Sequence, residues 1–240
     1  MAINGDMGWK STLSKRQICM CRLWNRLISM DENRLPRKVF NWDFKYCYHN
    51  WCYQMKELLK YVDMEASYHT KSFLNCKEIE RVLYIKQKQE WEINVKNVSK
   101  LRTYNTFKFE YCTETYVINL LSKGLRSALA QFRCGVLPLK IETGRYTCLP
   151  VFDRLCEMCK NQDVEDEMHF LLECPFYKNE RIDLFNQAEI DYENFDAIDN
   201  DVKMVILISD EDLLKHTAKY IITCYRKRAK GLTVAEPHSI

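Results

Sequence analysis

The chain has 240 residues, of which 47% are hydrophobic and 29% charged, so it is long enough for a sizeable core and is not a disordered chain. With only 6 glycines and 5 prolines, it favours a mainly α fold over a turn-rich β-sandwich or barrel. The net charge of +3 is unevenly distributed: residues 1–150 carry +11 and residues 151–240 carry −8. The basic first part favours an anionic partner, most commonly nucleic acid; the alternative is an ordinary solvated surface.

The sequence carries no signal for membrane insertion or secretion. Its longest apolar runs, such as residues 204–208, are too short to cross a bilayer. The first 20 residues include Lys10, Lys15 and Arg16 but no apolar stretch typical of a secretory signal. We therefore expect an intracellular protein, nuclear or cytoplasmic, in which most of the 12 cysteines pack as small apolar side chains and form no disulfide framework.

Apolar residues at helical spacing predict a first helix over residues 18–30. The following segment, residues 42–62, is rich in aromatic side chains interleaved with Lys45 and Lys56. Such a pattern fits either rings on which nucleic-acid bases stack or rings that fill a helix–helix core. We favour the core.

Two further helices follow in the first part of the chain. Asn75 with Glu78 three residues later is a capping-box pattern, which predicts the start of a charged, exposed helix over 79–98. Residues 113–133 give the clearest amphipathic pattern, with an apolar sector and a separate basic sector. Because glycine disfavours helix, we expect Gly124 to divide this region into two shorter helices.

Glycine and proline concentrate in residues 135–150, which we predict to be an irregular connector with a short strand over 139–141. The charge changes sign there, so this segment is the candidate domain boundary. The predicted organisation is a basic, aromatic-rich helical region (1–134), the connector (135–150), a zinc-knuckle module (151–190), and an acidic loop with a C-terminal helix (191–240). We expect that last helix to end near Arg228, where basic residues complement the helix dipole.

Four metal-ligand types lie in one short window of the chain. Cys156 and Cys159 form a C-x2-C pair, His169 follows after nine residues, and Cys174 after four more. Thiolates and imidazole are the ligands that Zn²⁺ prefers, and four protein ligands leave no open position, so the site should be structural and not hydrolytic. The alternatives are coincidental cysteines in a cysteine-rich chain and, less favoured, a redox pair. The predicted fold is thus mainly α, in bundle-like layers, with a small Cys-Cys-His-Cys knuckle inserted between helices.

The residues around this window resemble the region downstream of the polymerase in LINE-type (non-LTR) retrotransposon reverse transcriptases. The resemblance is strongest over residues 126–135, 138–146, 154–159 and 164–177, with Arg181 after them, and residues 5–9, 22–27 and 213–228 also fit. It implies a piece of a mobile-element polyprotein whose carboxy-terminal module binds nucleic acid, with Cys156, Cys159, His169 and Cys174 as the ligands of one zinc ion. The piece could be a truncated reading frame, a degenerate copy or a co-opted fragment.

Polymerase chemistry by two metal ions needs paired carboxylates, and the chain has no adjacent Asp-Asp pair. We therefore expect no enzyme but a module that binds RNA or single-stranded DNA. The candidate contact residues are Arg126, Arg133, Lys140 and Arg145, although Arg133 and Arg145 fit structural contacts equally well. The alternative is a zinc-stabilised scaffold that docks on a protein, such as the polymerase part of the same polyprotein, or a relic without function. The acidity of residues 151–240 favours that alternative for the second part.

Overall fold

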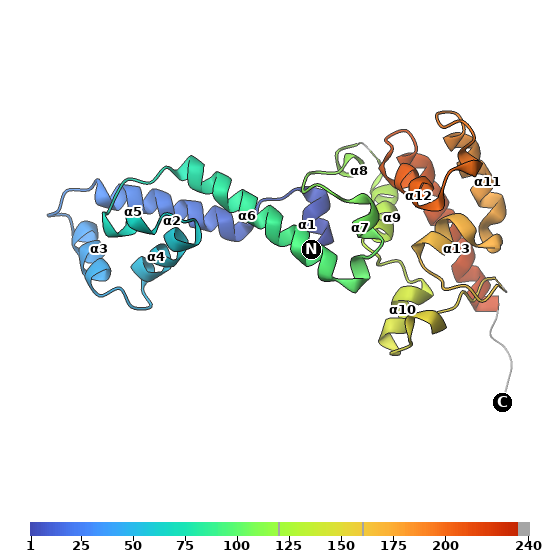
Figure 1. Ribbon diagram of the computed structural model, residues 1–240, viewed down its shortest axis with the longest axis horizontal. Coiled ribbons are helices and arrows are strands. Elements are labelled where there is room, and N and C mark those ends of the chain that lie inside the picture. Colours follow the sequence, from blue (N-terminus) through green and yellow to red (C-terminus); the bar gives the residue numbers. More distant parts are fainter. Residues whose placement is uncertain (120, 160, 235–240) are drawn as a thin grey trace. The chain divides into compact units, whose positions relative to one another are not determined.

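The computed structural model describes residues 1–119, 121–159 and 161–234. Over these residues the chain is mostly α-helical and contains two isolated β-bridges but no strand, which confirms the predicted mainly α fold (Figure 1). The chain divides into two compact units. One unit comprises residues 9–92; the other combines residues 1–8 with residues 93–240. The predicted connector at 135–150 therefore lies inside the second of these units.

The unit of residues 9–92 consists of helices with side-chain caps at several ends. Its elements are α2 (Thr12–Ile28), α3 (Leu35–Lys45), α4 (Trp51–Tyr61), α5 (Glu65–His69) and most of α6 (Cys76–Asn97). The side chains of Ser11 and Asn50 accept hydrogen bonds from the first turns of α2 and α4. Asn75 Oδ1 accepts from the backbone nitrogens of Lys77 and Glu78, which confirms Asn75 as the cap of α6.

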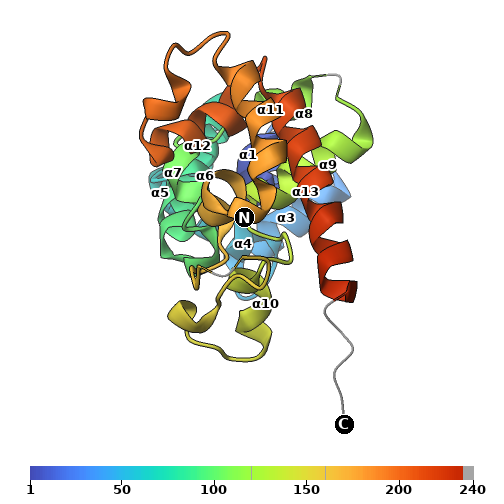
Figure 2. The same ribbon diagram turned by 90° about the vertical axis from the view of Figure 1, so that its right-hand side faces the viewer.

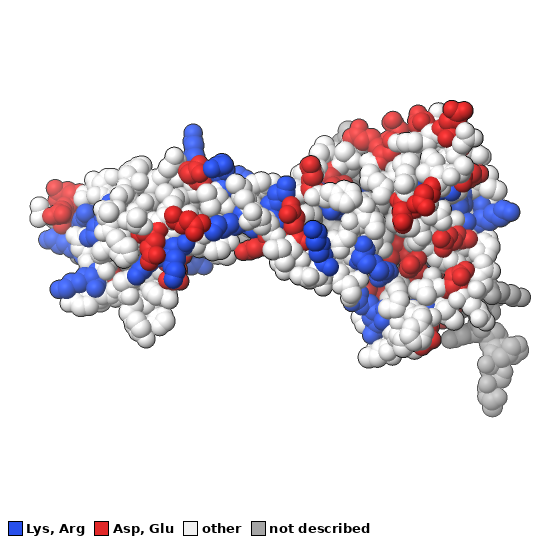
Figure 3. Space-filling model, in the orientation of Figure 1, with Lys and Arg blue, Asp and Glu red and all other residues white. Residues whose placement is uncertain are grey.

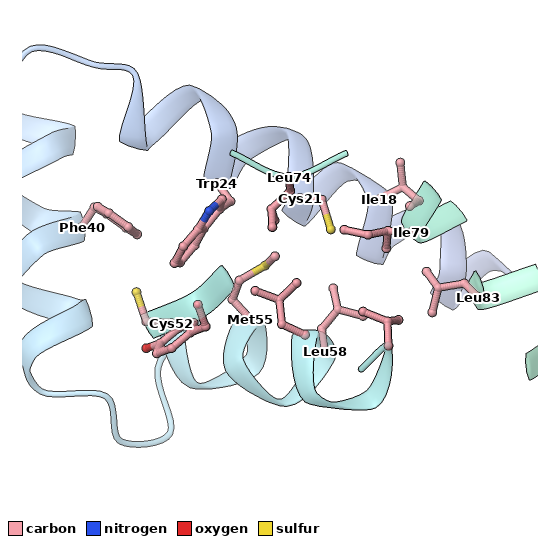
Figure 4. Packing of buried hydrophobic residues seen from close by; sticks show 13 residues of the cluster. Ile18, Cys21, Trp24, Phe40, Cys52, Met55, Leu58, Leu74, Ile79 and Leu83 are labelled. Atoms are coloured by element: carbon pink, nitrogen blue, oxygen red, sulfur yellow. The ribbon is translucent and has the colours of Figure 1, made fainter. Parts of the chain in front are cut away.

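The core of this unit is built around Trp24. The Trp24 ring is fully buried, meets Phe40 edge-on at 5.3 Å and stacks on Tyr68 at 5.5 Å, and its Nε1 donates to the Ser72 carbonyl at 3.0 Å. Figure 4 shows Trp24, Phe40 and Met55 pointing toward one another from α2, α3 and α4.

The aromatic-rich segment divides between the core and the surface. Phe44 and Trp51 pack against the core, whereas Trp42 and Tyr48 are exposed. The prediction that the rings of residues 42–62 fill a helix–helix core is therefore correct for only some of them. Alternation along the sequence placed neighbouring rings on opposite faces of α3.

The other unit is a set of helices packed around the last one. Its longer elements are α1 (Ala2–Met7), α9 (Lys123–Arg133), α10 (Lys140–Tyr146), α11 (Lys178–Ala188), α12 (Asn200–Ser209) and α13 (Leu214–Val234), with the short α7 (Tyr104–Phe107) and α8 (Thr115–Ile118). Helix α13 packs against α9, α11 and α12, and both views show it alongside α9 and α11 (Figures 1 and 2).

Three sequence predictions differ from this unit in detail. The strand expected over 139–141 is wrong, because α10 begins at Lys140 with Leu139 as its cap. The break in the amphipathic region precedes Gly124: α8 ends at Ile118, and α9 begins at Lys123. Helix α13 continues to Val234, so the basic residues near Arg228 lie inside the helix and not in its last turn.

A buried network of ion pairs and hydrogen bonds joins α1 to α9 within this unit. The Arg133 guanidinium, fully buried on α9, lies 3.2 Å from Asp6 Oδ2 and 2.6 Å from Glu114 Oε2. Tyr104 and Tyr116 donate to the two oxygens of Asp6 at 2.8 and 2.7 Å. Although burial disfavours the charged form, Asp6 and Glu114 hold the pKa of Arg133 above its ordinary value. The guanidinium and the two carboxylates thus compensate one another's charge, whereas burying any one of them alone would cost free energy.

Candidate metal centre

A short antiparallel hairpin carries the first two ligands, Cys156 and Cys159. The Cys156 nitrogen donates to the Asp163 carbonyl at 2.8 Å, and the Glu165 nitrogen donates to the Arg154 carbonyl at 2.9 Å. One isolated antiparallel bridge lies between these two hydrogen bonds. The hairpin turns the chain back after Cys159, so that the C-x2-C segment faces the residues that follow the second arm.

A π-helical turn over His169–Glu173 brings the other two ligands together. The Cys174 nitrogen donates to the His169 carbonyl at 2.7 Å, an i→i+5 bond that closes a wider turn than an α-helix does. Asp166 Oδ1 accepts from the His169 nitrogen at 2.9 Å and caps the start. In an unbroken α-helix residues five apart do not share a face. The wider π-helical turn, which ends before Pro175, allows His169 and Cys174 to reach the same centre although they are five residues apart.

The four ligand atoms converge on one centre. The sulfurs of Cys156 and Cys174 are 3.9 Å apart, Cys159 Sγ lies 3.4 Å from His169 Nε2, and all four ligand atoms lie within 4.8 Å of one another. A tetrahedral zinc ion with Zn–S bonds of about 2.3 Å holds its sulfur ligands about 3.8 Å apart. Cys156, His169 and Cys174 are buried, and Cys159 is half-buried. The cluster therefore has the donor types and spacing to hold a metal ion, and it lies between helices as predicted.

The histidine ring is oriented as a ligand. Its Nε2 faces Cys159, while its Nδ1 is buried without a hydrogen-bond partner among the described residues. Carboxylate oxygens of Asp163 and Glu173 lie 3.9 and 3.8 Å from Nδ1, beyond hydrogen-bond distance but on the side where metal-bound histidines face a carboxylate.

The four side chains of the cluster shift one another's pKa values. A hydrogen bond from the Cys174 thiol outweighs burial and, with one from His169, lowers the pKa of Cys156 to about 3. The same hydrogen bond raises the pKa of Cys174. Burial alone would lower the pKa of His169, yet Cys156 and the nearby carboxylates raise it. Burial also raises the pKa of Cys159. Without a metal ion, Cys156 is therefore the thiol that ionises first, and a divalent ion would have to displace protons from Cys159 and Cys174 on binding.

Two buried arginines hold the ligand-bearing segment against α11 and α13. Arg181 on α11 donates to the carbonyls of Leu171 and Cys174 at 3.0 and 2.8 Å. Arg228 on α13 donates to both carboxylate oxygens of Glu165 at 2.7 Å each. Such bidentate pairs are stronger and more directional than neutral hydrogen bonds. Arg181 is part of the resemblance to the retrotransposon proteins. The helical pattern around Arg228 gave no indication that its side chain is buried against Glu165.

The segment is also anchored by an apolar contact beside His169. Phe170 is fully buried, with its ring 6.5 Å from Phe132 of α9 and 6.1 Å from Tyr220 of α13. The Tyr220 hydroxyl donates to the Phe170 carbonyl at 3.0 Å. The residue adjacent to a ligand is therefore part of the helical core.

We expect Arg181→Met to weaken metal binding about 10- to 100-fold, the usual effect of removing an outer-shell partner, because the carbonyls of Leu171 and Cys174 lose their common donor. Competition with a chromophoric chelator would measure this. Arg226→Met, which changes an exposed arginine of α13, is the control. An unchanged dissociation constant in Arg181→Met would contradict the support role.

The structure separates the four predicted nucleic-acid contacts. Arg126 is exposed and has no ion pair among the residues described. Arg133 is buried in the network with Asp6, so it makes a structural contact and is excluded from the candidate interface. Lys140 and Arg145 are half-buried, and each pairs with a glutamate carboxylate. A phosphate would have to compete for these two side chains.

Comparison with known protein families, with characterised proteins and with solved structures finds no match. Over residues 1–119, 121–159 and 161–234, no helix combines the length and the apolar character needed to cross a membrane.

Proposed function

We propose that the chain is a non-catalytic, zinc-organised module that binds RNA or single-stranded DNA. The observation that carries this proposal is the convergence of Cys156, Cys159, His169 and Cys174 on one centre. Three thiolates and one imidazole are a donor set that selects zinc over hard cations such as magnesium. Four protein ligands fill a tetrahedral ion, so the metal would have a structural role and no position for an attacking water.

The nucleic-acid part of the proposal is supported by charge and by the resemblance to non-LTR retrotransposon reverse transcriptases. Residues 1–150 carry the positive charge, and Lys and Arg side chains are spread over the visible face of the unit of residues 9–92 (Figure 3). Of the four candidate contacts, Arg126 is the one that is exposed and has no ion pair among the described residues, so it is available to a phosphate. We infer that the chain belongs to a mobile-element polyprotein, acts inside the cell, and works beside a polymerase part.

A protein-interaction scaffold is the second candidate, and one observation favours it. Asp and Glu side chains gather over α11 and α12 on the face shown in Figure 3, and residues 151–240 carry a net charge of −8. Such a surface repels phosphates and suits a basic protein partner.

The test combines metal content with binding of a single-stranded RNA and a single-stranded DNA oligonucleotide by the full chain. We expect one zinc per chain. If about four phosphates are contacted, affinity should fall about 50-fold between about 50 and about 200 mM salt. Arg126→Ala should weaken binding and reduce the salt slope by about one contact, whereas Arg226→Ala on α13 should not.

The outcomes separate the candidates. Zinc without oligonucleotide binding would favour the scaffold. Binding that does not change with salt would contradict phosphate contacts. A chain without bound metal would remove the proposal itself.

A further inference from the structure

An aromatic face lies exposed on the unit of residues 9–92, and no contact described so far explains it. It consists of Trp42 on α3 and Tyr46 at the end of α3, whose exposed fractions are 62% and 52%; a second exposed group follows, with Tyr48 (78%) in the α3–α4 connector and Tyr53 (38%) on α4. On the opposite side of α3, Phe40 and Phe44 pack into the core. Exposed aromatic side chains clustered in this way mark interaction surfaces more often than isolated ones do.

The rings of this face are arranged in neighbouring groups. Trp42 and Tyr46 are one helical turn apart, with centroids 5.1 Å apart and planes at 48°. His49 lies between the other two tyrosines, with centroids 4.2 Å from Tyr48 and 5.7 Å from Tyr53. Because these rings hold one another in place, they offer planar surfaces at a low cost in side-chain entropy.

Positive charge accompanies the rings. Residues 34–60 contain six Lys and Arg side chains against two carboxylates, Asp43 and Glu57. Lys38 and Lys45 lie two turns apart on α3, are exposed, and have no ion pair within the described part of the chain. Lys45 Nζ sits 5.3 Å from the centroid of the Tyr46 ring. Cations without a carboxylate partner beside exposed rings are the two elements of a surface that binds single-stranded nucleic acid.

We propose that this aromatic face binds single-stranded RNA or DNA, with bases stacked on Trp42 and Tyr46 and phosphates contacted by Lys38 and Lys45. The inference rests on the proposed function and gives it a location outside the metal centre. Stacking tolerates every base, so binding here should show little sequence preference. The apolar side chains of Leu35 and Val39 lie exposed on the same side of α3. A protein partner, the alternative occupant, would bury these two side chains.

The experiment uses the full chain with fluorescein-labelled oligo-dT and oligo-U. Trp42→Ala/Tyr46→Ala should weaken binding of both probes about 5- to 150-fold for each stacked base that is lost. Trp42→Phe should retain most of the affinity. Phe73→Ala, which removes an aromatic side chain that is 70% exposed in the same unit, is the matched control and should leave affinity unchanged. Unlabelled oligo-dT should quench the part of the tryptophan emission that Trp42→Phe removes.

Each further outcome is decisive. Unchanged affinity in the double variant, together with unquenched Trp42 emission, would overturn this inference and leave the face to a protein partner. Wild-type binding of the probes in that case would still support the proposed function. Failure of the wild-type chain to bind either probe would overturn both. Metal content and circular dichroism of every variant should match the wild type, because the changed side chains are exposed.

Discussion

Removal of a zinc ion bound as proposed at the Cys156, Cys159, His169 and Cys174 cluster is expected to unfold the segment that carries these ligands. It should lower the stability of the unit that contains the cluster by about 10 kcal/mol, the range found for structural zinc in small modules. Over residues 151–159 and 161–177 the ligand segment holds little regular structure: one isolated bridge, one π-helical turn and short 3₁₀ turns. Without the ion, the thiols and the imidazole of the cluster would remain buried in a low-dielectric site with no metal bonded to them, which is unfavourable for polar groups. Its remaining anchors, such as Arg228 with Glu165, cannot replace four coordinate bonds.

Thermal unfolding with and without a strong chelator measures this effect. Cys174→Ser should reproduce the chelator result, since serine does not supply a thiolate and the position is fully buried. Cys148→Ser is the control, because Cys148 is exposed and lies outside the cluster. Equal melting temperatures with and without chelator would contradict a structural ion.

Arg133→Met should destabilise the same unit by about 3–5 kcal/mol, because it leaves the buried Asp6 carboxylate without its cation, whereas Glu114 keeps its ion pair with Lys108. The guanidinium also donates to the Ile208 carbonyl at 2.9 Å, which ties α9 to the end of α12. Urea unfolding monitored by circular dichroism gives the change in free energy. Arg126→Met, on the exposed side of the same helix, should change stability by no more than about 0.5 kcal/mol.

A second substitution tests whether the loss comes from unpaired charge. Asp6→Asn/Arg133→Met removes one charge of each sign and keeps an amide whose oxygen can accept from one of the Tyr104 and Tyr116 hydroxyls while its nitrogen donates to the other. It should be more stable than Arg133→Met alone. If the double variant is less stable than the single one, packing around Arg133 and not charge compensation is the main contribution.

The sequence was sufficient for the features that depend on composition and local spacing. Scarce glycine and proline predicted a mainly α chain, Asn75 marked the start of α6, and the C-x2-C, His and Cys spacing identified the side chains that converge. These features follow from short-range rules that one segment satisfies by itself.

The remaining features depend on contacts between distant residues. The spacing of apolar residues that indicates an α-helix does not predict the π-helical turn, in which the Cys174 nitrogen donates to the His169 carbonyl. The charge of Arg133 looks the same in sequence whether it faces solvent or Asp6, and the rings of residues 42–62 give no sign of which will be buried. Which of these side chains become buried depends on the helices that pack against them, and the local sequence does not contain that information.

The ion pair between Asp6 and Arg133 joins residues 127 positions apart, with the whole unit of residues 9–92 inserted between them. A ribosome adding about 5–20 residues per second needs roughly 6–25 s to travel that distance. During synthesis the inserted unit can complete its own core while α1 still lacks its partners. We therefore expect α1 to stay without its Arg133 partner, and accessible to proteases and chaperones, throughout the synthesis of the inserted unit.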